Sequence, residues 1–388
     1  MAWLCRRLII FFAIPAALLS IAFAVSYAGP YKYSRGIYEF LAFLLLVDLA
    51  FGLCGHWRNI AIVFASTIFG LSTIEIASAA MEPGQEVYAR GFSVSRPIVG
   101  WGPAAAGTYH SVKTAAGKLI FDVTYTIDEN LIRKTLSGKG DSSIAFFGDS
   151  FTFGEGLQDS ETLPQYYADL TGRKQKVYNF GFPGYGPQQF LRVIESGIYD
   201  RLLSETKIFV YETAAWHAER AACVPEFVSR APRYLLRDGI PIYAGSCKQG
   251  AWRAVCDFVV GSALFRRFVR PIVNRATAAD VELYLAELKQ INELVNEKYG
   301  ARLVILYIAG NDSYLSKSKF TDAKIEKTLK AGDIEFIDAT LSRQNFPTNA
   351  SRIIPGDGHP SALANRVRAK ILADYLSSGA AAWHMANP

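Results

Sequence analysis

The sequence contains a serine, an aspartate and a histidine that could together form a serine nucleophile with its base and carboxylate. The apolar run 144–147 ends at Gly148-Asp149-Ser150, a pattern typical of a buried strand that turns sharply and presents Ser150 at its carboxyl end. Near the C-terminus, Asp357 and His359 share one glycine-rich loop. A serine needs a base to take its proton, and the base needs a carboxylate to fix its tautomer. These residue types therefore predict acyl chemistry, although Gly-Asp-Ser alone is also an ordinary turn sequence.

A second glycine-rich loop, with Gly181, Gly184 and Gly186, follows the apolar segment 176–180 and precedes a predicted helix over 190–198. Strand, glycine loop and helix in this order raise the possibility of a dinucleotide site. The spacing here is G-x-x-G-x-G instead of G-x-G-x-x-G, and the loop does not follow the first strand of the sheet. We therefore expect a loop that allows a ligand close to the backbone, and no cofactor.

Strand and helix patterns alternate through the second half of the chain. Further strands are predicted at 207–211, 303–308 and 334–337, with helices at 162–170, 280–298 and 363–376. This alternation is typical of an α/β fold with a doubly wound parallel sheet, which holds ligands at the carboxyl ends of its strands. The segment 218–275 reads as an insertion, with a hairpin over 233–244 that turns at Asp238-Gly239.

The N-terminal part is strongly apolar. Three segments, 8–28, 37–54 and 60–80, each approach the roughly 20 residues that span a bilayer as a helix. We expect three transmembrane helices over residues 1–80, a β-rich lead-in over 81–140 and the parallel-sheet domain over 141–388. With Arg6 and Arg7 on the inner side, the chain would be a multi-pass protein of the cytoplasmic membrane with its catalytic domain on the outer, periplasmic face.

Charge and cysteine content exclude some functions. The formal charge of +6 is modest, and the chain lacks a basic block with interleaved aromatic residues, so nucleic acid is not expected as a partner. None of the five cysteines forms a close C-x-x-C pair, so no metal is expected. In an oxidising compartment, Cys223 and Cys247 could form a disulfide around the hairpin. Pairing of Cys223 with Cys256, or three reduced cysteines, remain alternatives.

These residue groups resemble the SGNH (GDSL-type) hydrolase family over residues 144–376. Gly148-Asp149-Ser150 is similar to the first block, which implies that Ser150 is the nucleophile. Asn179 to Gly184 is similar to the second block, which implies that the backbone N–H groups of Ser150 and Gly184 form an oxyanion hole. Asp357 and His359 are similar to the last block, which implies an acid and a base.

Two blocks depart from the family pattern. Where the family has Gly-x-Asn-Asp after the third strand, this chain has residues 213–217, and we expect His217 to donate to the oxyanion or else to orient the insertion. The literal Gly310-Asn311-Asp312 follows the fourth strand and is treated as a turn. The last block is Asp-x-His instead of Asp-x-x-His, so Asp338 is a fallback partner for His359.

The resemblance implies a membrane-anchored serine esterase or O-acyltransferase. The expected substrates are acylated, above all O-acetylated, cell-surface glycans, and the expected partners are the lipid bilayer and a membrane acyl-donor protein. The alternative is a non-catalytic glycan-binding or assembly subunit that retains the fold.

Overall fold

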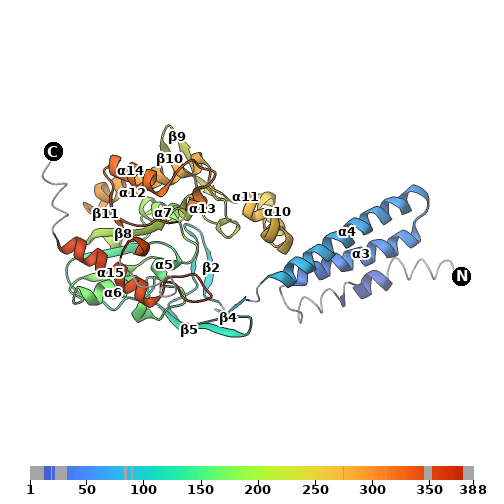
Figure 1. Cartoon of the computed structure of the whole chain (residues 1–388), viewed down its shortest axis with the longest axis horizontal. Helices are drawn as coiled ribbons and strands as arrows, with labels where there is room; N and C mark the ends of the chain where they lie inside the picture. The colour runs from blue at the N-terminus through green and yellow to red at the C-terminus, as the bar shows by residue number, and fades with distance from the viewer. Residues whose placement is uncertain are drawn as a thin grey trace. The chain divides into compact units, whose positions relative to one another are not determined.

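The computed structural model describes residues 13–18, 20–21, 33–82, 85–88, 91–273, 275–310, 312–344 and 352–378. The chain divides into two compact units, which Figure 1 draws together. The first unit combines residues 1–83 with residues 254–273, and the second combines residues 84–253 with residues 274–388. The insertion expected at 218–275 therefore contributes to both units, because its residues 254–273 belong with the N-terminal helices.

Two antiparallel helices form most of the first unit. They are α3 (Ser34–Gly52) and α4 (Gly55–Met81). Ser72 Oγ donates to the carbonyl of Gly36 at 2.8 Å, and the rings of Phe43 and Phe69 lie 5.0 Å apart. The first pair joins the start of α3 to the second half of α4, and the second pair joins the middles of the two helices. The two helices therefore form an antiparallel hairpin.

Among the described residues, only α4 is long and apolar enough to cross a membrane. We expected three spans, and this correction has a physical reason. The 19 residues of α3 include Arg35, Glu39 and Asp48, and three charged groups are costly in a helix that only just reaches across the hydrocarbon. The first expected span, 8–28, lies largely outside the described residues.

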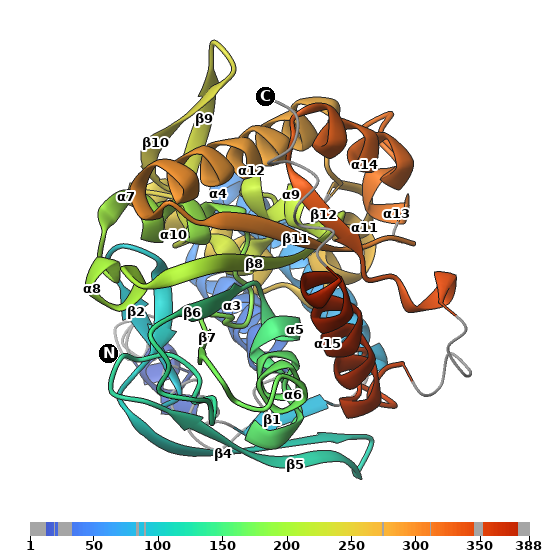
Figure 2. The ribbon, with the colours of Figure 1, turned by 90° about the vertical axis from the view of Figure 1, so that its left-hand side faces the viewer.

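A five-stranded parallel sheet forms the centre of the second unit (Figure 2). Its strands are β6 (Ser143–Phe147), β7 (Lys176–Asn179), β8 (Thr206–Ala214), β11 (Arg302–Ile308) and β12 (Glu335–Asp338). The order β12-β11-β8-β6-β7 is the flavodoxin-like order, which confirms the predicted parallel α/β sheet. In this order the topological switch point lies between β6 and β8, and ligands are held at the carboxyl ends of these two strands.

Alternate residues of each strand face opposite layers of helices. Phe147, Phe209 and Ile305 belong to one core cluster, together with residues of α7 (Pro187–Ser196) and α12 (Ala278–Tyr299). The intervening residues of the same strands belong to a second cluster, with α6 (Leu163–Leu170) and α15 (Ala362–Ser377). Both faces of the sheet are therefore covered, which explains why its strands read as continuous apolar runs.

The expected β-rich lead-in is present. Its strands are β1 (Gln85–Tyr88), β2 (Ser93–Arg96), β3 (Gly100–Pro103), β4 (Gly107–Ala115) and β5 (Lys118–Ile127). β1, β4 and β5 pair antiparallel, and β2 and β3 form a separate hairpin. Buried Arg133, just after β5, donates to the carbonyls of Phe153, Gly154 and Leu157 at 2.7 Å each. Arg133 therefore ties the end of the lead-in to the turn that follows Ser150.

The remaining elements connect the sheet strands or build the insertion. They are α5 (Ser150–Phe153), η3 (Asp159–Glu161), α8 (Asp200–Leu203), α9 (Trp216–Ala221), η4 (Glu226–Val228), β9 (Pro232–Arg237), β10 (Ile240–Ser246), α10 (Gly250–Val260), η5 (Phe265–Val269), α11 (Arg270–Val273), α13 (Asp312–Leu315), α14 (Asp322–Ala331) and η6 (Leu341–Arg343). The predicted hairpin is β9–β10, and Asp238 and Gly239 both take positive φ at its turn, as a tight two-residue hairpin requires.

Candidate active site

Ser150 lies at the carboxyl end of β6, where the chain turns into α5. The turn requires Gly148, because a Cβ there would lie 2.1 Å from Thr152 Oγ1. The preceding Asp149 caps the short helix by accepting a hydrogen bond from the backbone N–H of Phe151 at 2.8 Å. Ser150 is 6% exposed, so most of the residue is buried in the turn.

His359 reaches Ser150 from a loop that lies 209 residues further along the chain. Its Nε2 lies 2.9 Å from Ser150 Oγ, and its Nδ1 is hydrogen-bonded to Oδ2 of Asp357. With the proton on Nδ1, Nε2 is free to accept from the serine hydroxyl. Gly358 has a φ of +96°, which allows the carboxylate of Asp357 to fold back onto the imidazole two residues later. The structure therefore brings together the three residues that the sequence singled out.

The carboxylate of Asp357 is fully buried and doubly bound. Lys113, from β4, donates to Oδ1, the oxygen that the His359 ring does not use. Burial opposes ionisation, but the hydrogen bonds from His359 and Lys113 outweigh it and hold the pKa of Asp357 at about 2. Asp338, the fallback partner, is instead bound by the backbone N–H of Thr340 and by Arg343, each at 2.9 Å. The geometry therefore favours Asp357 as the partner of His359.

Two opposing effects set the protonation of His359. Burial favours the neutral ring, but the hydrogen bond to Asp357 and the charges of Glu155 and Asp357 outweigh it and raise the pKa of His359 above 6.5. Glu155 Oε2 lies 3.5 Å from Nε2 of His359, and its own pKa is raised chiefly by burial. Neither Lys113 nor Glu155 was expected from the sequence, because neither falls in a recognisable motif.

Asp149 organises the other side of the serine. Its Oδ2 accepts hydrogen bonds from Trp216 Nε1 at 3.1 Å, His217 Nε2 at 3.1 Å and Arg220 Nη1 at 2.6 Å. Burial opposes its ionisation, but the charge of Arg220 and the bond from His217 hold the pKa of Asp149 far below its usual range. Asp149 is therefore a permanent carboxylate that fixes the start of α9 against the nucleophile turn.

His217 does not have the geometry of the oxyanion donor that we expected. Its Nε2 is engaged by Asp149, and its Nδ1 lies 2.7 Å from the Tyr211 hydroxyl and 2.9 Å from Thr213 Oγ1. The ring is fully buried, and burial is the main cause that lowers its pKa to about 4. Both ring nitrogens are thus used inside the protein. The other role considered, a histidine that orients the insertion, agrees with these contacts.

A pocket of about 400 Å³ opens beside Ser150. It is lined by Trp101, Ser150, Pro183, Gly184, Arg220 and Phe227. Gly184 has a φ of +82°, and a Cβ there would lie 3.2 Å from both the Trp101 and the Phe227 rings. Trp101 is fixed by a hydrogen bond from Nε1 to the carbonyl of Pro183 at 2.9 Å. Of the residues that follow β8, Arg220 lines this pocket and His217 does not.

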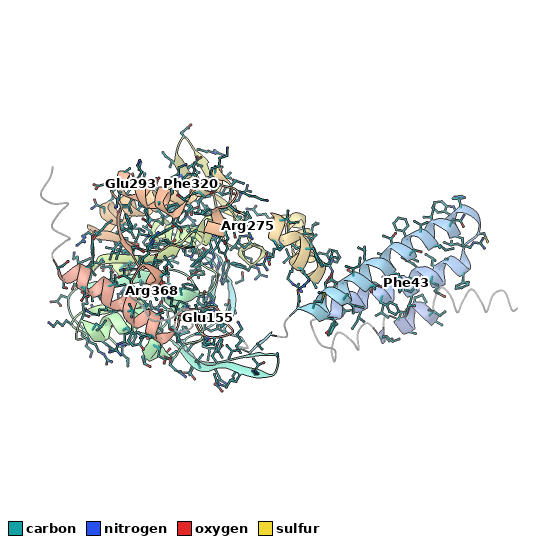
Figure 3. All side chains as sticks on the ribbon, in the orientation of Figure 1. Phe43, Glu155, Arg275, Glu293, Phe320 and Arg368 are labelled. Atoms are coloured by element: carbon teal, nitrogen blue, oxygen red, sulfur yellow. A yellow bond between two sulfur atoms is a disulfide. The ribbon has the colours of Figure 1, made fainter. Side chains whose placement is uncertain are left out.

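A buried polar pair lies beneath the nucleophile turn. Thr152 Oγ1 donates to Glu212 Oε2 at 2.8 Å, and the other carboxylate oxygen of Glu212 lies 3.6 Å from Arg368. Burial raises the pKa of Glu212 to about 7, although the charge of Arg368 acts against this shift. Figure 3 labels Arg368 and Glu155 among the side chains of this unit.

Asn179 joins the second glycine loop to the nucleophile turn. Asn179 Nδ2 donates to the carbonyl of Thr152, and its Oδ1 accepts from the N–H of Gly181, each at 3.0 Å. This side chain holds the second glycine loop against α5.

Cys223 and Cys247 are joined in a disulfide that closes the segment bearing Phe227. Cys256 is a free thiol.

The described residues contain no group of three or more His, Cys, Asp or Glu side chains that could hold a metal ion. Asn311, the centre of the literal Gly-Asn-Asp sequence, lies outside the described residues, and Gly310 donates its N–H to Asp322 at 2.8 Å.

The chain matches no protein-family model and no curated protein. Among solved structures, it is similar to a putative lipolytic protein of the G-D-S-L family from Desulfitobacterium hafniense, with 11% identity, a TM-score of 0.37 and coverage of 60% of this chain and 98% of that one. A G-D-S-L family lipolytic protein from Veillonella parvula matches with 13% identity, a TM-score of 0.35 and coverage of 61% and 98%. A carbohydrate acetylesterase family member from Sinorhizobium meliloti matches with 12% identity, a TM-score of 0.35 and the same coverage.

Proposed function

We propose that this protein is a membrane-anchored serine esterase of the SGNH type that cleaves or transfers O-acyl groups through an acyl-enzyme on Ser150. The observation that carries the proposal is the chain of contacts from Ser150 Oγ to His359 Nε2 at 2.9 Å and from His359 Nδ1 to Asp357. A buried hydroxyl, an imidazole with a free acceptor nitrogen and a fixed carboxylate are the three parts that activate a serine.

The proposed mechanism has two halves. In the first, Ser150 Oγ forms a bond to the ester carbonyl carbon while His359 Nε2 takes the hydroxyl proton, and Asp357 stabilises the imidazolium. His359 then gives this proton to the leaving alcohol as the ester bond breaks. In the second half, water or a sugar hydroxyl attacks the acyl-enzyme, His359 takes its proton, and the same nitrogen returns the proton to Ser150. Hydrolysis and acyl transfer differ only in this second nucleophile.

The oxyanion would be bound by the backbone N–H groups of Ser150 and Gly184 and by the side chain of Arg220, three residues after the third-block segment 213–217. Arg220 lines the pocket together with both residues, and its Nη1 is already fixed by Asp149 and by the carbonyl of Tyr185 at 2.5 Å. A guanidinium has five N–H donors, so the remaining ones are free to serve a ligand in the pocket. Donors held in place before reaction are the most effective stabilisers of an oxyanion.

An acylated glycan is the substrate class that we propose. The pocket holds two aromatic rings, Trp101 and Phe227, and one cation, Arg220. The C–H faces of sugar rings pack on aromatic side chains, while a small acyl group fits beside the glycine between them. If the reaction is transfer, an acyl-donor protein in the membrane would load Ser150.

We place the catalytic unit on the outer face of the cytoplasmic membrane. Helix α4 supplies the proposed anchor, and the disulfide between Cys223 and Cys247 supports an oxidising compartment for the unit that follows it.

The direct test is hydrolysis of p-nitrophenyl acetate by the full chain in detergent. Ser150→Ala should abolish turnover, whereas Ser160→Ala, at an exposed position ten residues further on, should retain it. Equal thermal unfolding of the two variants would show that the loss is chemical. Turnover that survives in Ser150→Ala would refute the proposal. An inactive but folded wild-type chain that still binds glycan would instead favour the non-catalytic subunit.

A further inference from the structure

A buried carboxylate in the proposed membrane helix α4 binds residues 262–264 of the insertion. Glu75 of α4 is 5% exposed and accepts hydrogen bonds from Ser262 Oγ at 2.6 Å and from the backbone N–H groups of Ala263 and Leu264 at 2.6 and 3.2 Å. Unsatisfied N–H groups at the start of a helix are costly in lipid, and so is an isolated carboxylate. Glu75 therefore satisfies both requirements, because it caps the helical segment that continues through η5 and α11.

Two further contacts fasten the insertion to the same end of the α3–α4 hairpin. Arg266 forms a two-pronged pair with Glu82, just after α4, with N–O distances of 2.9 and 3.0 Å. Arg35, at the start of α3, donates to the carbonyl of Phe258 and lies 4.2 Å from the centre of its ring. Since α3 and α4 run antiparallel, the start of α3 and the end of α4 lie together, at the end where the chain leaves the hairpin for the catalytic unit.

The insertion exposes an unusual number of large apolar side chains. They are Val255 (48%), Phe258 (66%), Val259 (38%), Phe268 (53%), Val269 (37%) and Ile272 (66%). Exposed apolar side chains gathered in one segment mark a surface that another phase or partner covers. Arg266, Arg267 and Arg270 stand among them, and apolar residues mixed with arginines are typical of helices that lie in the headgroup region of a membrane.

We propose that residues 254–273 lie in the bilayer interface beside α4, as a second membrane-contacting element of the chain. The proposed occupant is lipid, because residues 254–273 belong to the same compact unit as α4, whose Val63 and Phe64 are 64% and 60% exposed. Arg267 suits the phosphates of anionic lipids. The hairpin drawn in Figure 3, with Phe43 labelled, and the insertion would thus form one membrane-facing unit. This inference rests on the proposed anchoring by α4 but not on the proposed chemistry.

The inference can be tested by fluorescence quenching in vesicles of phosphatidylcholine and phosphatidylglycerol. Cys5, Cys54 and Cys256 are replaced by serine in the full chain, the disulfide is kept, and an NBD probe is attached to one introduced cysteine. Val255→Cys and Ile272→Cys report on residues 254–273, and Phe64→Cys reports on α4. The control is Ile242→Cys, 43% exposed on β10, in the part of the insertion that belongs to the second unit. Doxyl-labelled lipids act as the quencher.

We expect the probes at 255 and 272 to lose most of their emission to doxyl lipids and to shift to the blue, as the probe at 64 does, while the probe at 242 does neither. The inference is overturned if the probes at 255 and 272 are neither quenched nor shifted, like the probe at 242, while the probe at 64 is quenched. It is also overturned if they are shielded from both doxyl lipid and soluble iodide, because protein then covers them. If the probe at 64 is not quenched either, the proposed anchoring by α4 is refuted as well. None of these outcomes depends on esterase activity.

Discussion

Lys113 donates to the one oxygen of Asp357 that the His359 ring leaves free. The lysine comes from β4 of the lead-in, 244 residues before the aspartate, and is 8% exposed. The lead-in is therefore part of the proposed catalytic apparatus, because Lys113 holds the carboxylate that contacts the proposed base, His359.

Lys113→Met should lower kcat/KM for p-nitrophenyl acetate by about ten- to a hundredfold, since a hydrogen bond between charged groups contributes about 1.5–3 kcal/mol. Lys113→Arg should restore part of the loss. Lys118→Met, at an exposed position of β5, is the matched control and should be neutral. Unchanged kinetics in Lys113→Met would show that Asp357 does not need this support.

The pH dependence of the reaction should follow His359. Only the neutral imidazole can accept the serine proton, and the pKa of His359 is raised above 6.5. The rate should therefore rise with pH, with an acidic midpoint higher than that of an ordinary histidine. Asp357→Asn removes a charge that raises this pKa, so its acidic limb should move to lower pH while kcat falls by about 10⁴. The check is a pH profile of kcat/KM for both proteins, and an unmoved limb would argue against direct coupling.

Sequence patterns predicted the sheet and the three residues of the proposed triad because each depends on local signals. The strand before Ser150 is an apolar run that ends at an obligatory glycine, and Asp357 and His359 share one short loop. No local sequence pattern predicted the contacts of Lys113, Glu155 and Arg220. Each is an ordinary charged residue in the sequence and gains its position only when distant segments fold together.

The contacts of His217 do not fit the expected donor role, for a related reason. An imidazole can serve as a donor, but the sequence does not show that Asp149, Tyr211 and Thr213 already use both ring nitrogens. The expectation of three spans counted apolar residues in α3 and gave too little weight to its three charged ones. In the same way, the insertion 218–275 was visible as a break in the strand and helix pattern, but its contact with α4 depends on single polar residues.

Arg220 offers a test of the oxyanion arrangement. Arg220→Lys keeps a cation near buried Asp149 but loses the planar fork, so the protein should remain folded while kcat falls by about a hundredfold. Arg230→Lys, an exposed exchange in the insertion, is the control. Steady-state kinetics and thermal unfolding should be measured together. Wild-type kcat in Arg220→Lys would exclude Arg220 as a donor to the transition state.

Glu287 is expected to limit stability. It is fully buried on α12, and neither carboxylate oxygen has a hydrogen-bond partner among the described residues. The pKa of Glu287 is raised well above its usual value, chiefly by burial and to a lesser degree by the charge of Glu195. Because the folded state holds this proton more tightly than the unfolded chain, stability should fall as pH rises from about 4.5 through the raised pKa.

Glu287→Leu should therefore increase the free energy of unfolding by about 1–3 kcal/mol at neutral pH and should flatten its fall with pH. Glu282→Leu, on the exposed side of the same helix, provides the comparison and should change little. Thermal unfolding in detergent across pH measures both effects. A destabilised Leu variant would indicate that Glu287 has a partner of its own.

The claim that Ser150 is an activated nucleophile is tested most directly by locating a covalent adduct. The full chain is treated with a fluorophosphonate, digested, and its peptides are identified by mass spectrometry. The adduct should be found on Ser150 in the wild type and should be lost or greatly slowed in His359→Ala, because the hydroxyl then lacks its base. No adduct in the folded wild-type chain, or an adduct on another residue that His359→Ala does not affect, would contradict the account.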